Sequence, residues 1–322
     1  MKKIQSHVIC ITLCMLTISC SQEVQPLVVG FWNVENLFDT EDDPNKNDDE
    51  FAIGGRKKVT QDIYKLKINN SAEVLYDLNA DVLGLCEVEN RIVLDELNKA
   101  YSARNYKIVH EESPDERGID NALLYDPGKL KVLSSRAIRN DLPKGGKTRD
   151  ILYVNGQYGG EDIHIFINHW PSNYGGREKA IPKRAATAAL IAKEISIILR
   201  KDADAEIILL GDFNEDPDEM NVQSLKSVGL SSLMEPMLGQ PKTGTYVYRG
   251  EDLFYDQIII SEGLRDKAGL GFDPESVTIL DLPKYRQQEG DFAHYPFRFW
   301  AGNRLLGGYS DHLAVRVAII KK

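Results

Sequence analysis

Side chains suited to metal binding and proton transfer stand beside short apolar runs at several points along the chain. Apolar runs at 27–32, 82–86, 163–167 and 207–210 are each followed by such residues, and those at 258–260 and 313–320 are each preceded by them. The residues in question are Asn33, Glu35, Glu87, His169, Asp212, Asn214, Asp256, Asp311 and His312. Carboxylates, amides and imidazoles placed in this way indicate a built site at the ends of strands.

These residue types fit the hydrolysis of a phosphoester. Mg²⁺ binds hard oxygen ligands and keeps several of its waters, so glutamate and asparagine oxygens can hold it without cysteine. The metal neutralises phosphate charge and stabilises the leaving oxygen. A carboxylate can orient and deprotonate the attacking water, and a histidine held by an aspartate can give general-acid or electrostatic help. Mn²⁺ is the expected substitute for Mg²⁺.

The elements that must position these residues are strands interleaved with helices. The apolar runs, together with 122–125, are mostly continuous, which is typical of strands in sheets covered on both faces. Helical patterns occupy 63–78, 92–100 and 185–199, the last with Pro182 at an early helical position. No linker interrupts this pattern, so we expect one mixed α/β domain over 25–322. If the last two strands run opposite to the others, all the polar residues reach the same rim of the sheets.

Seven short motifs resemble, in order, those of the endonuclease/exonuclease/phosphatase (DNase I-like) superfamily. They are NVENLF at 33–38, GLCEVEN at 84–90, RGIDNALLYDP at 117–127, NHWPSNYGGR at 168–177, LLGDFNEDP at 209–217, YDQIIIS at 255–261 and YSDHLAV at 309–315. A single motif such as GDFN is moderately specific, whereas seven in the right order are far more so. The resemblance implies a four-layer α/β/β/α sandwich, in which two mixed β-sheets pack together with helices outside.

The resemblance also implies a role for each matching residue. Glu87 is similar to the family's principal metal ligand, with Asn33 and Asp311 nearby. Asp212 resembles the carboxylate that activates water, and Asn214 the amide that orients phosphate. The remaining catalytic residues implied are His312, braced by Asp256, and His169, which resembles a second phosphate-facing histidine. Abasic-site endonucleases usually carry tyrosine at that last position, which argues against a role in DNA repair.

Several further residues have two open interpretations. Arg149 and Arg177 either bind substrate phosphate, which a guanidinium matches, or form surface ion pairs. Lys179, Lys183 and Arg184 form either a local basic patch or an ordinary solvated helix face, and Asp120 either braces His169 or is an exposed turn residue. Four aromatic residues before Asp311 either stack on bases or lipid, or pack within the protein; they are Tyr295, Phe297, Phe299 and Trp300.

The first twenty residues have the layout of a bacterial lipoprotein signal peptide. A basic start at Lys2 and Lys3 is followed by an apolar run and by Thr-Ile-Ser before Cys20. We expect residues 1–20 to direct export and Cys20 to carry lipid, which would anchor the chain to the cell envelope, at the outer membrane or cell surface of a bacterium. Cys86 would then be the one thiol outside the segment, and we expect it to be a small buried residue.

Charge and composition narrow the substrate class. The chain has 322 residues and a net charge of −10, and removal of the two lysines in the signal segment makes it −12. An acidic body disfavours tight non-specific duplex binding, which needs Lys and Arg to neutralise phosphates. The charge does not exclude a nuclease, because the acidic residues can be concentrated at a metal site. Export and the resemblance at His169 suit the breakdown of extracellular nucleic acid, so we favour an exported nuclease that cleaves DNA or RNA. The alternatives are a lipid-headgroup or inositol-phosphate phosphoesterase and, from another class, a non-catalytic surface binding lipoprotein; the oligomeric state stays open.

Overall fold

The computed structural model describes residues 24–266 and 268–322. The predicted signal peptide at 1–20 and the predicted lipid attachment site at Cys20 lie outside the described residues. Within the described residues, no helix has the length and apolar character needed to cross a membrane.

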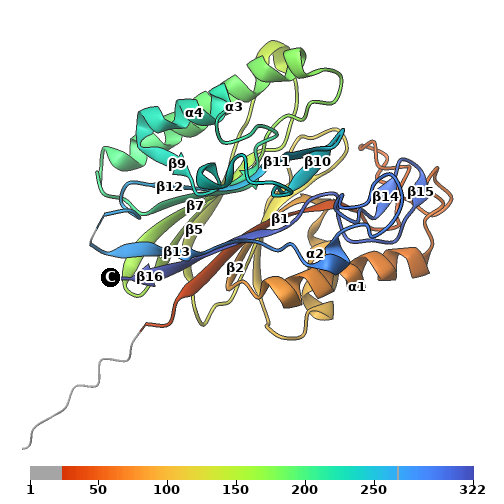
Figure 1. Cartoon of the computed structure of the whole chain (residues 1–322), viewed down its shortest axis with the longest axis horizontal. Coiled ribbons are helices and arrows are strands. Elements are labelled where there is room, and N and C mark those ends of the chain that lie inside the picture. The colour runs from red at the N-terminus through yellow and green to blue at the C-terminus, as the bar shows by residue number, and fades with distance from the viewer. Residues whose placement is uncertain (1–23, 267) are drawn as a thin grey trace, which may run out of the picture.

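Two six-stranded mixed sheets lie face to face, with helices on both outer faces, as Figure 1 shows. The first sheet has the order β13 (Leu270–Ile279), β16 (Val315–Lys321), β1 (Leu27–Leu37), β2 (Val82–Val88), β4 (Asp120–Tyr125) and β3 (Lys107–His110). The second has the order β5 (Lys131–Ile138), β6 (Ile151–Tyr158), β7 (Glu161–His169), β8 (Ile207–Asp212), β12 (Asp256–Ser261) and β9 (Leu230–Ser232). The predicted four-layer sandwich is confirmed.

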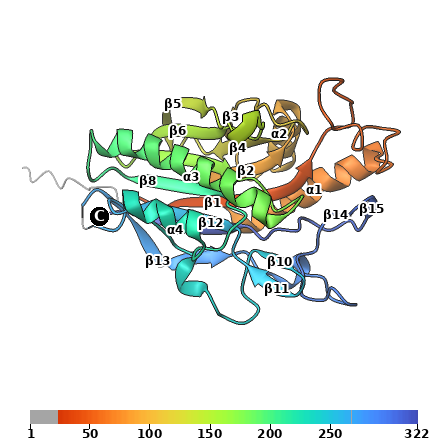
Figure 2. The ribbon, with the colours of Figure 1, turned by 90° about the horizontal axis from the view of Figure 1, so that it is seen from above.

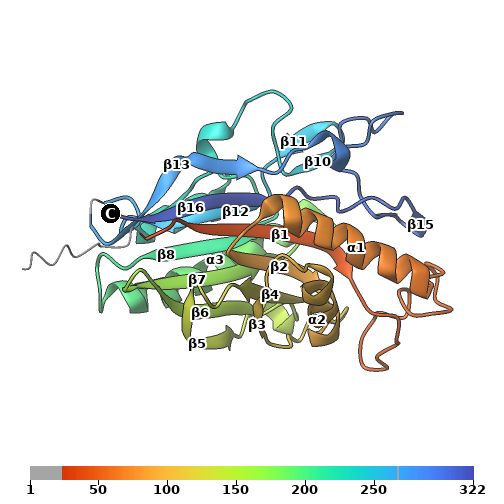
Figure 3. The same ribbon diagram turned by 90° about the horizontal axis from the view of Figure 1, so that it is seen from below.

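Helices α1 (Gln61–Leu78) and α2 (Arg91–Ala100) cover the first sheet, and α3 (Arg177–Leu199) and α4 (Met220–Ser224) cover the second (Figures 2 and 3). The hydroxyl oxygen of Thr60 accepts a hydrogen bond from the backbone N–H of Ile63 and caps α1, and the Asn90 side chain caps α2 in the same way. Helix α3 begins at Arg177, eight residues before the predicted start, with Pro182 inside it. Four short 3₁₀ helices are η1 (Pro143–Gly145), η2 (Leu225–Val228), η3 (Glu235–Met237) and η4 (Pro283–Tyr285).

Two two-stranded sheets project beyond the sandwich at the end away from the C-terminus (Figure 1). One joins β10 (Tyr246–Tyr248) to β11 (Glu251–Leu253), and the other joins β14 (Trp300–Ala301) to β15 (Arg304–Leu305). Neither was predicted, because these strands are two or three residues long and carry polar and charged side chains among the apolar ones.

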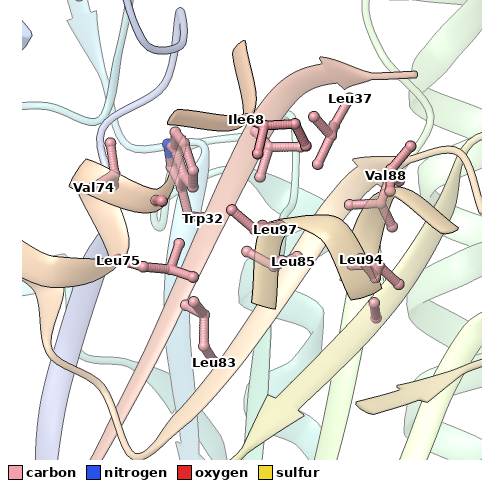
Figure 4. Packing of buried hydrophobic residues seen from close by; sticks show 14 of the residues in the cluster. Trp32, Leu37, Ile68, Val74, Leu75, Leu83, Leu85, Val88, Leu94 and Leu97 are labelled. Carbon is pink, nitrogen blue, oxygen red and sulfur yellow. The ribbon is translucent and has the colours of Figure 1, made fainter. Parts of the chain in front are cut away.

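Three apolar layers hold the sandwich together. Figure 4 shows the layer in which Trp32 of β1 and Leu85 of β2 pack against Leu75 of α1 and Leu97 of α2. A second layer lies between the two sheets, and a third lies between the second sheet and α3. The two sheets approach closely at Gly84, where a Cβ atom would lie 3.2–3.3 Å from side chains of both sheets. Burial of this much apolar surface is the main force that fixes the strand ends, and with them the site.

Candidate active site

The strand directions bring the predicted polar residues to one rim. Strands β1 and β2 are parallel, as are β7 and β8, while β16 runs antiparallel to β1 and β12 antiparallel to β8. The ends of the first four strands therefore meet the beginnings of the last two, as predicted. Asp212 pairs across the second sheet with His169 on one side and with Asp256 on the other. The rim lies at the end of the molecule away from the C-terminus (Figure 1).

Asp212 is the centre of the hydrogen-bond network at this rim. Its Oδ1 atom accepts hydrogen bonds from the backbone N–H (2.9 Å) and side-chain amide (3.0 Å) of Asn214. Its Oδ2 atom accepts one from Nδ2 of Asn33 (3.1 Å), which joins the two sheets. Burial raises the pKa of Asp212 to about 7, and the nearby Asp256 adds to the rise while His312 opposes it. A carboxyl group with this pKa is suited to accept a proton near neutral pH.

His312 and Asp256 form the predicted pair. Nδ1 of His312 lies 2.6 Å from Oδ2 of Asp256, and both side chains are buried. Burial alone would lower the pKa of His312, but the carboxylates of Asp256 and Asp212 outweigh it and hold that pKa well above its ordinary value. This shift favours the imidazolium form of the ring, and Nε2 lies 3.9 Å from Oδ2 of Asp212.

His169 faces the same carboxyl with the opposite protonation. Its Nε2 atom lies 3.6 Å from Oδ2 of Asp212 and 3.9 Å from Oε1 of Glu87. Burial lowers the pKa of His169 well below its ordinary value, and the positive charges of Arg149, Arg117 and His312 lower it further. One imidazolium and one neutral imidazole thus flank Asp212.

Backbone strain is concentrated at this rim. Glu35, Asn36, Glu87 and Asn214 all have positive φ values, of 54°, 54°, 61° and 50°. The first three lie where the pairing of β1 with β2 and of β2 with β4 shifts its register. Non-glycine residues rarely adopt this conformation, and such residues cluster at functional sites, where the surrounding structure over-determines them. In a regular strand the Glu87 side chain would point to the face opposite that of its two neighbours. The irregular backbone at Glu87 changes this direction, and its Oε1 atom lies at the rim.

The donors at the rim suit a hard divalent cation. Oε2 of Glu87 accepts a hydrogen bond from the backbone N–H of Asn36 (2.9 Å), which fixes the carboxylate and leaves Oε1 turned to the rim. Oδ1 of Asn33 accepts from the Glu35 backbone N–H (3.0 Å) and keeps a second lone pair. Carboxylate and amide oxygens are the ligands that Mg²⁺ prefers, so these residues fit the predicted metal. Asp311 is paired with Arg298, which would compete with a metal for its Oδ2 atom.

One carboxylate–imidazole cluster of metal-binding proportions lies at the rim among the described residues. Asp212, Asp256 and His312 place one ligand atom each within 4.8 Å of one another. His312 could use only one nitrogen for a metal, and its Nδ1 is already bonded to Asp256. The geometry and the raised pKa of His312 favour proton transfer and anion binding for this cluster, and favour the Glu87 side of the rim for a metal.

A buried lysine beneath the rim was missed by sequence reasoning. Lys67 on α1 donates hydrogen bonds to the backbone carbonyls of Val34 (2.6 Å) and Tyr309 (2.8 Å). Burial lowers the pKa of Lys67 to about 8, although Glu35 and Asp311 oppose the shift. Glu35 accepts hydrogen bonds from the backbone N–H groups at 299 and 300, and so ties β1 to the segment before His312. The sequence held a sign of its burial, because Lys67 lies on the mostly apolar face of the helix α1.

The two predicted phosphate-binding arginines differ in burial. Arg149 is buried, pairs with Asp115 (3.2 Å) and donates to the backbone carbonyls of His169 and Trp170. These contacts position the loop that carries His169. Arg177 is 54% exposed at the start of α3 and pairs with Glu219 at 2.8 Å. Phosphate binding by either residue stays a prediction.

Two further residues depart from both of their predicted interpretations. Arg184 is fully buried, where it pairs with Glu215 (2.7 Å) and donates to Asn173 (3.0 Å), so it belongs neither to a basic patch nor to a solvated helix face. Asp120 is also fully buried and bonds to His110 at 3.0 Å, so it neither braces His169 nor lies in an exposed turn. In both cases a side chain from another segment provides the polar partner.

Comparison with known proteins gives the family. The model of the Endonuclease/Exonuclease/phosphatase family matches residues 28–321. No match to the chain was found among curated protein sequences.

Solved structures share the fold. D. rerio TDP2 complexed with single-strand DNA product is 15% identical over 91% of this chain and 98% of that chain, with a TM-score of 0.59. The human Nocturnin catalytic domain with bound sulfate is 18% identical over 94% and 97%, with a TM-score of 0.59. A mannosyl-6-phosphatase of Bacteroides thetaiotaomicron is 18% identical over 91% and 99%, with a TM-score of 0.56. With almost its whole described length matched by the family model, and a buried Asp212–Asp256–His312 cluster at the rim, this chain is a phosphoester hydrolase that belongs to the endonuclease/exonuclease/phosphatase family.

Proposed function

We propose that this protein is an exported, Mg²⁺-dependent phosphodiesterase that hydrolyses DNA or RNA. The observation that carries the proposal is the arrangement around Asp212, a buried carboxyl group whose pKa burial raises to about 7, with Nε2 of His169 at 3.6 Å and Nε2 of His312 at 3.9 Å from its Oδ2 atom. Hydrolysis needs a group that takes a proton from water and another that stabilises or protonates the leaving oxygen, and this arrangement supplies both.

Each residue of the rim has a proposed role. Asp212 orients the attacking water and accepts its proton. His312, held by Asp256, donates a hydrogen bond or a proton to the leaving oxygen. Asn214 and His169 orient the phosphate, the former through its side-chain amide and the latter as a neutral imidazole. A non-catalytic binding lipoprotein would gain little from such a matched base and acid.

Glu87, Asn33 and Asp311 are the residues that we propose to hold the metal. When bound, Mg²⁺, or Mn²⁺ in its place, would offset phosphate charge and stabilise the leaving oxygen. For Asp311 to serve, its bond to Arg298 must open. The Arg298 side chain is 39% exposed and the Asp311 side chain 20%. Substrate phosphate is an alternative partner for the Arg298 guanidinium.

Nucleic acid is the substrate that we favour. A TDP2 structure with the same fold holds a single-strand DNA product. The second candidate is a phosphatase or phosphodiesterase of small phosphorylated headgroups, such as sugar, inositol or lipid headgroup phosphates. It is favoured by the similar likeness to a mannosyl-6-phosphatase.

A substrate panel separates the two candidates. Purified protein with Mg²⁺ would be given plasmid DNA, RNA, bis-p-nitrophenyl phosphate, mannose 6-phosphate and vesicles that contain sphingomyelin. We expect cleavage of DNA or RNA together with the small diester. If DNA and RNA stay intact while the small diester is hydrolysed quickly, the nuclease proposal fails. Hydrolysis of mannose 6-phosphate or sphingomyelin would then support the second candidate.

We also propose that export and lipid attachment at Cys20 place the enzyme on the cell envelope. The support is the sequence of the first twenty residues. Cells fed labelled palmitate should label the wild-type protein and leave the Cys20→Ser variant unlabelled. Equal labelling of the two proteins would refute the anchor but not the export.

A further inference from the structure

A pocket of about 510 Å³ opens beside the catalytic rim, a volume in the range of pockets that hold small ligands. Its walls come from β10, from the loop before β14 and from β15, the elements that project at the right of Figure 1. None of the rim residues discussed above except Asp311 and its partner Arg298 lines it. We propose that this pocket holds the nucleotide next to the scissile phosphate, with its base against exposed aromatic rings and its outer phosphate against arginines. The inference rests on the proposed function and names its substrate contacts.

The pocket is continuous with the catalytic pair. Tyr246 lines the pocket, and its ring lies 4.7 Å from the ring of His312, centroid to centroid. The backbones of the same two residues form an isolated β-bridge. The Tyr246 ring also stacks on Tyr255 at 5.3 Å, which helps to hold it in place. A group bound against Tyr246 would therefore lie next to His312, where the leaving oxygen is proposed to be.

Two aromatic side chains of the pocket are exposed to solvent. Tyr248 and Phe292 are 51% and 57% exposed, which is uncommon for rings of this size in the described part of the chain. Phe292 packs against Tyr295 in a T-shaped pair, with the ring centroids 5.3 Å apart. Base–aromatic stacking contributes about 1–3 kcal/mol per base and tolerates any base. Of the four aromatic residues with two predicted roles, Tyr295 lines this pocket, whereas Phe299 and Trp300 pack in the core.

Arginines supply positive charge on an otherwise acidic protein. Arg249, Arg298 and Arg304 all line the pocket, and Asp311 is the one carboxylate that does. Arg249 lies over the Tyr248 ring at 5.2 Å, and neither it nor Arg304 has a carboxylate within 4.0 Å among the described residues. Both are exposed. Unpaired guanidinium groups beside open rings suit a ligand that combines a flat ring with a phosphate.

The same inventory disfavours a bare sugar phosphate. A sugar ring brings several hydroxyl groups, each of which donates a hydrogen bond and needs an acceptor when it is buried. The pocket has few side-chain acceptors, chiefly Gln287, the tyrosine hydroxyls and Asp311, which Arg298 already engages. A nucleoside 3′,5′-bisphosphate keeps at most one free sugar hydroxyl and can place its base against the aromatic rings. It therefore leaves fewer hydrogen-bond donors unsatisfied than a sugar phosphate does.

Binding of small ligands tests the pocket without depending on turnover. Isothermal titration would use the Asp212→Asn variant, which should not consume the ligand, with adenosine 3′,5′-bisphosphate, ribose 5-phosphate and mannose 6-phosphate. We expect the nucleotide to bind at least tenfold more tightly than either sugar phosphate. Replacing Tyr248 and Phe292 together with alanine should weaken nucleotide binding about 5- to 100-fold, because stacking is lost, and Tyr248→Phe should retain it.

Arg136 offers a matched control for Arg249. Like Arg249 it lies over a tyrosine ring, that of Tyr153 at 5.0 Å, but it sits on β5 and pairs with Glu194. Arg249→Ala should weaken binding of the bisphosphate about tenfold, and Arg136→Ala should leave it unchanged. Sugar phosphates that bind as tightly as the nucleotide, or aromatic variants that bind the nucleotide like the parent protein, would overturn the proposal.

Failure of the pocket and failure of the nuclease are distinguishable. If the pocket variants lose nucleotide binding but the wild type leaves DNA and RNA intact, the pocket stands and the proposed nuclease function falls. If the wild type cleaves nucleic acid and the Tyr248→Ala, Phe292→Ala double variant does so with the same KM, the nuclease stands and the pocket proposal is refuted.

Discussion

Nε2 of His312 lies 3.9 Å from Oδ2 of Asp212, so an imidazolium and a carboxyl group face each other without a direct hydrogen bond. The two residues come from different sheets, and each is held from behind. Asn214 and Asn33 hold Asp212, and Asp256 holds His312. Both facing atoms are therefore oriented but keep hydrogen-bonding capacity for a third group. This is the preorganisation that hydrolysis of a phosphoester requires.

If His312 acts as a general acid, the effect of removing it should depend on the leaving group. A nucleic-acid alkoxide needs a proton to depart, whereas p-nitrophenolate is a stable anion. His312→Ala should lower kcat on DNA or RNA by about 10²–10⁴-fold and lower kcat on bis-p-nitrophenyl phosphate much less. The measurement compares kcat for the two substrates in the same variant. Equal losses on both would assign His312 to electrostatic stabilisation instead.

Removal of the metal should abolish activity. EDTA should stop hydrolysis of bis-p-nitrophenyl phosphate, and added Mg²⁺ or Mn²⁺ should restore it. Glu87→Gln removes one ligand charge and should raise the Mg²⁺ concentration for half-maximal rate at least tenfold, the lower end of what loss of a ligand-shell partner costs. Glu161→Gln, at the turn between β6 and β7, is the control and should keep the wild-type midpoint. Full activity in EDTA would rule out the metal assignment.

Arg177 and Arg91 form a matched pair for testing phosphate contact. Both side chains are 54% exposed and both pair with one carboxylate; Arg177 begins α3, eight residues after His169, and Arg91 begins α2. We expect DNA cleavage to fall with salt with a shallow slope, roughly two to four units in a plot of log kcat/KM against log salt. Arg177→Ala should reduce that slope by about 0.9 and Arg91→Ala should leave it unchanged. A slope that is the same in all three proteins would remove Arg177 from the phosphate contacts.

Glu206, which lies just before β8 at the end opposite Asp212, should make the free energy of unfolding depend on pH. Burial raises its pKa to about 7, and Asp266 adds to the rise, while the Leu270 N–H bonded to Oε1 at 2.7 Å opposes it. The folded state then binds the proton more tightly than the unfolded state, whose pKa is about 4.3. Its contribution is present below pH 4 and is lost as the pH rises to 7.

Glu206→Gln keeps the acceptor and removes the titration. Because the side chain is partly exposed, we expect a gain of only about 1 kcal/mol in the free energy of unfolding at pH 8, with no gain near pH 4. Urea unfolding at the two pH values measures the difference. A variant that is less stable than wild type at pH 8 would contradict the sign.

The strand ends could be predicted from sequence, because continuous apolar runs mark buried strands and polar residues directly beside them must lie at the rim. Asp212, Asp256, His169 and His312 were placed correctly for this reason. Short or exposed strands could not be predicted in this way. In β5, for example, most side chains face solvent and form no apolar run.

What sequence did not predict depends on partners distant along the chain. The burial of Arg184 is decided by Glu215, and that of Arg149 by Asp115. A charged residue in sequence gives no sign of such a partner, so both were expected at the surface or at phosphate. The pocket beside Tyr246 is likewise built by two segments, 246–249 and 287–311, whose meeting only the fold determines.

The central claim is that Asp212 accepts the proton from the attacking water, and its direct test is kcat for Asp212→Asn with Mg²⁺ and bis-p-nitrophenyl phosphate. Asparagine keeps the acceptor that bonds the Asn214 N–H, so the fold should be retained, as circular dichroism would verify. Asp95→Asn, on the exposed side of α2 with its side chain 57% exposed, is the control. We predict a fall of about 10²–10⁴-fold in kcat for Asp212→Asn and none for Asp95→Asn. A kcat for Asp212→Asn within threefold of wild type would contradict the account.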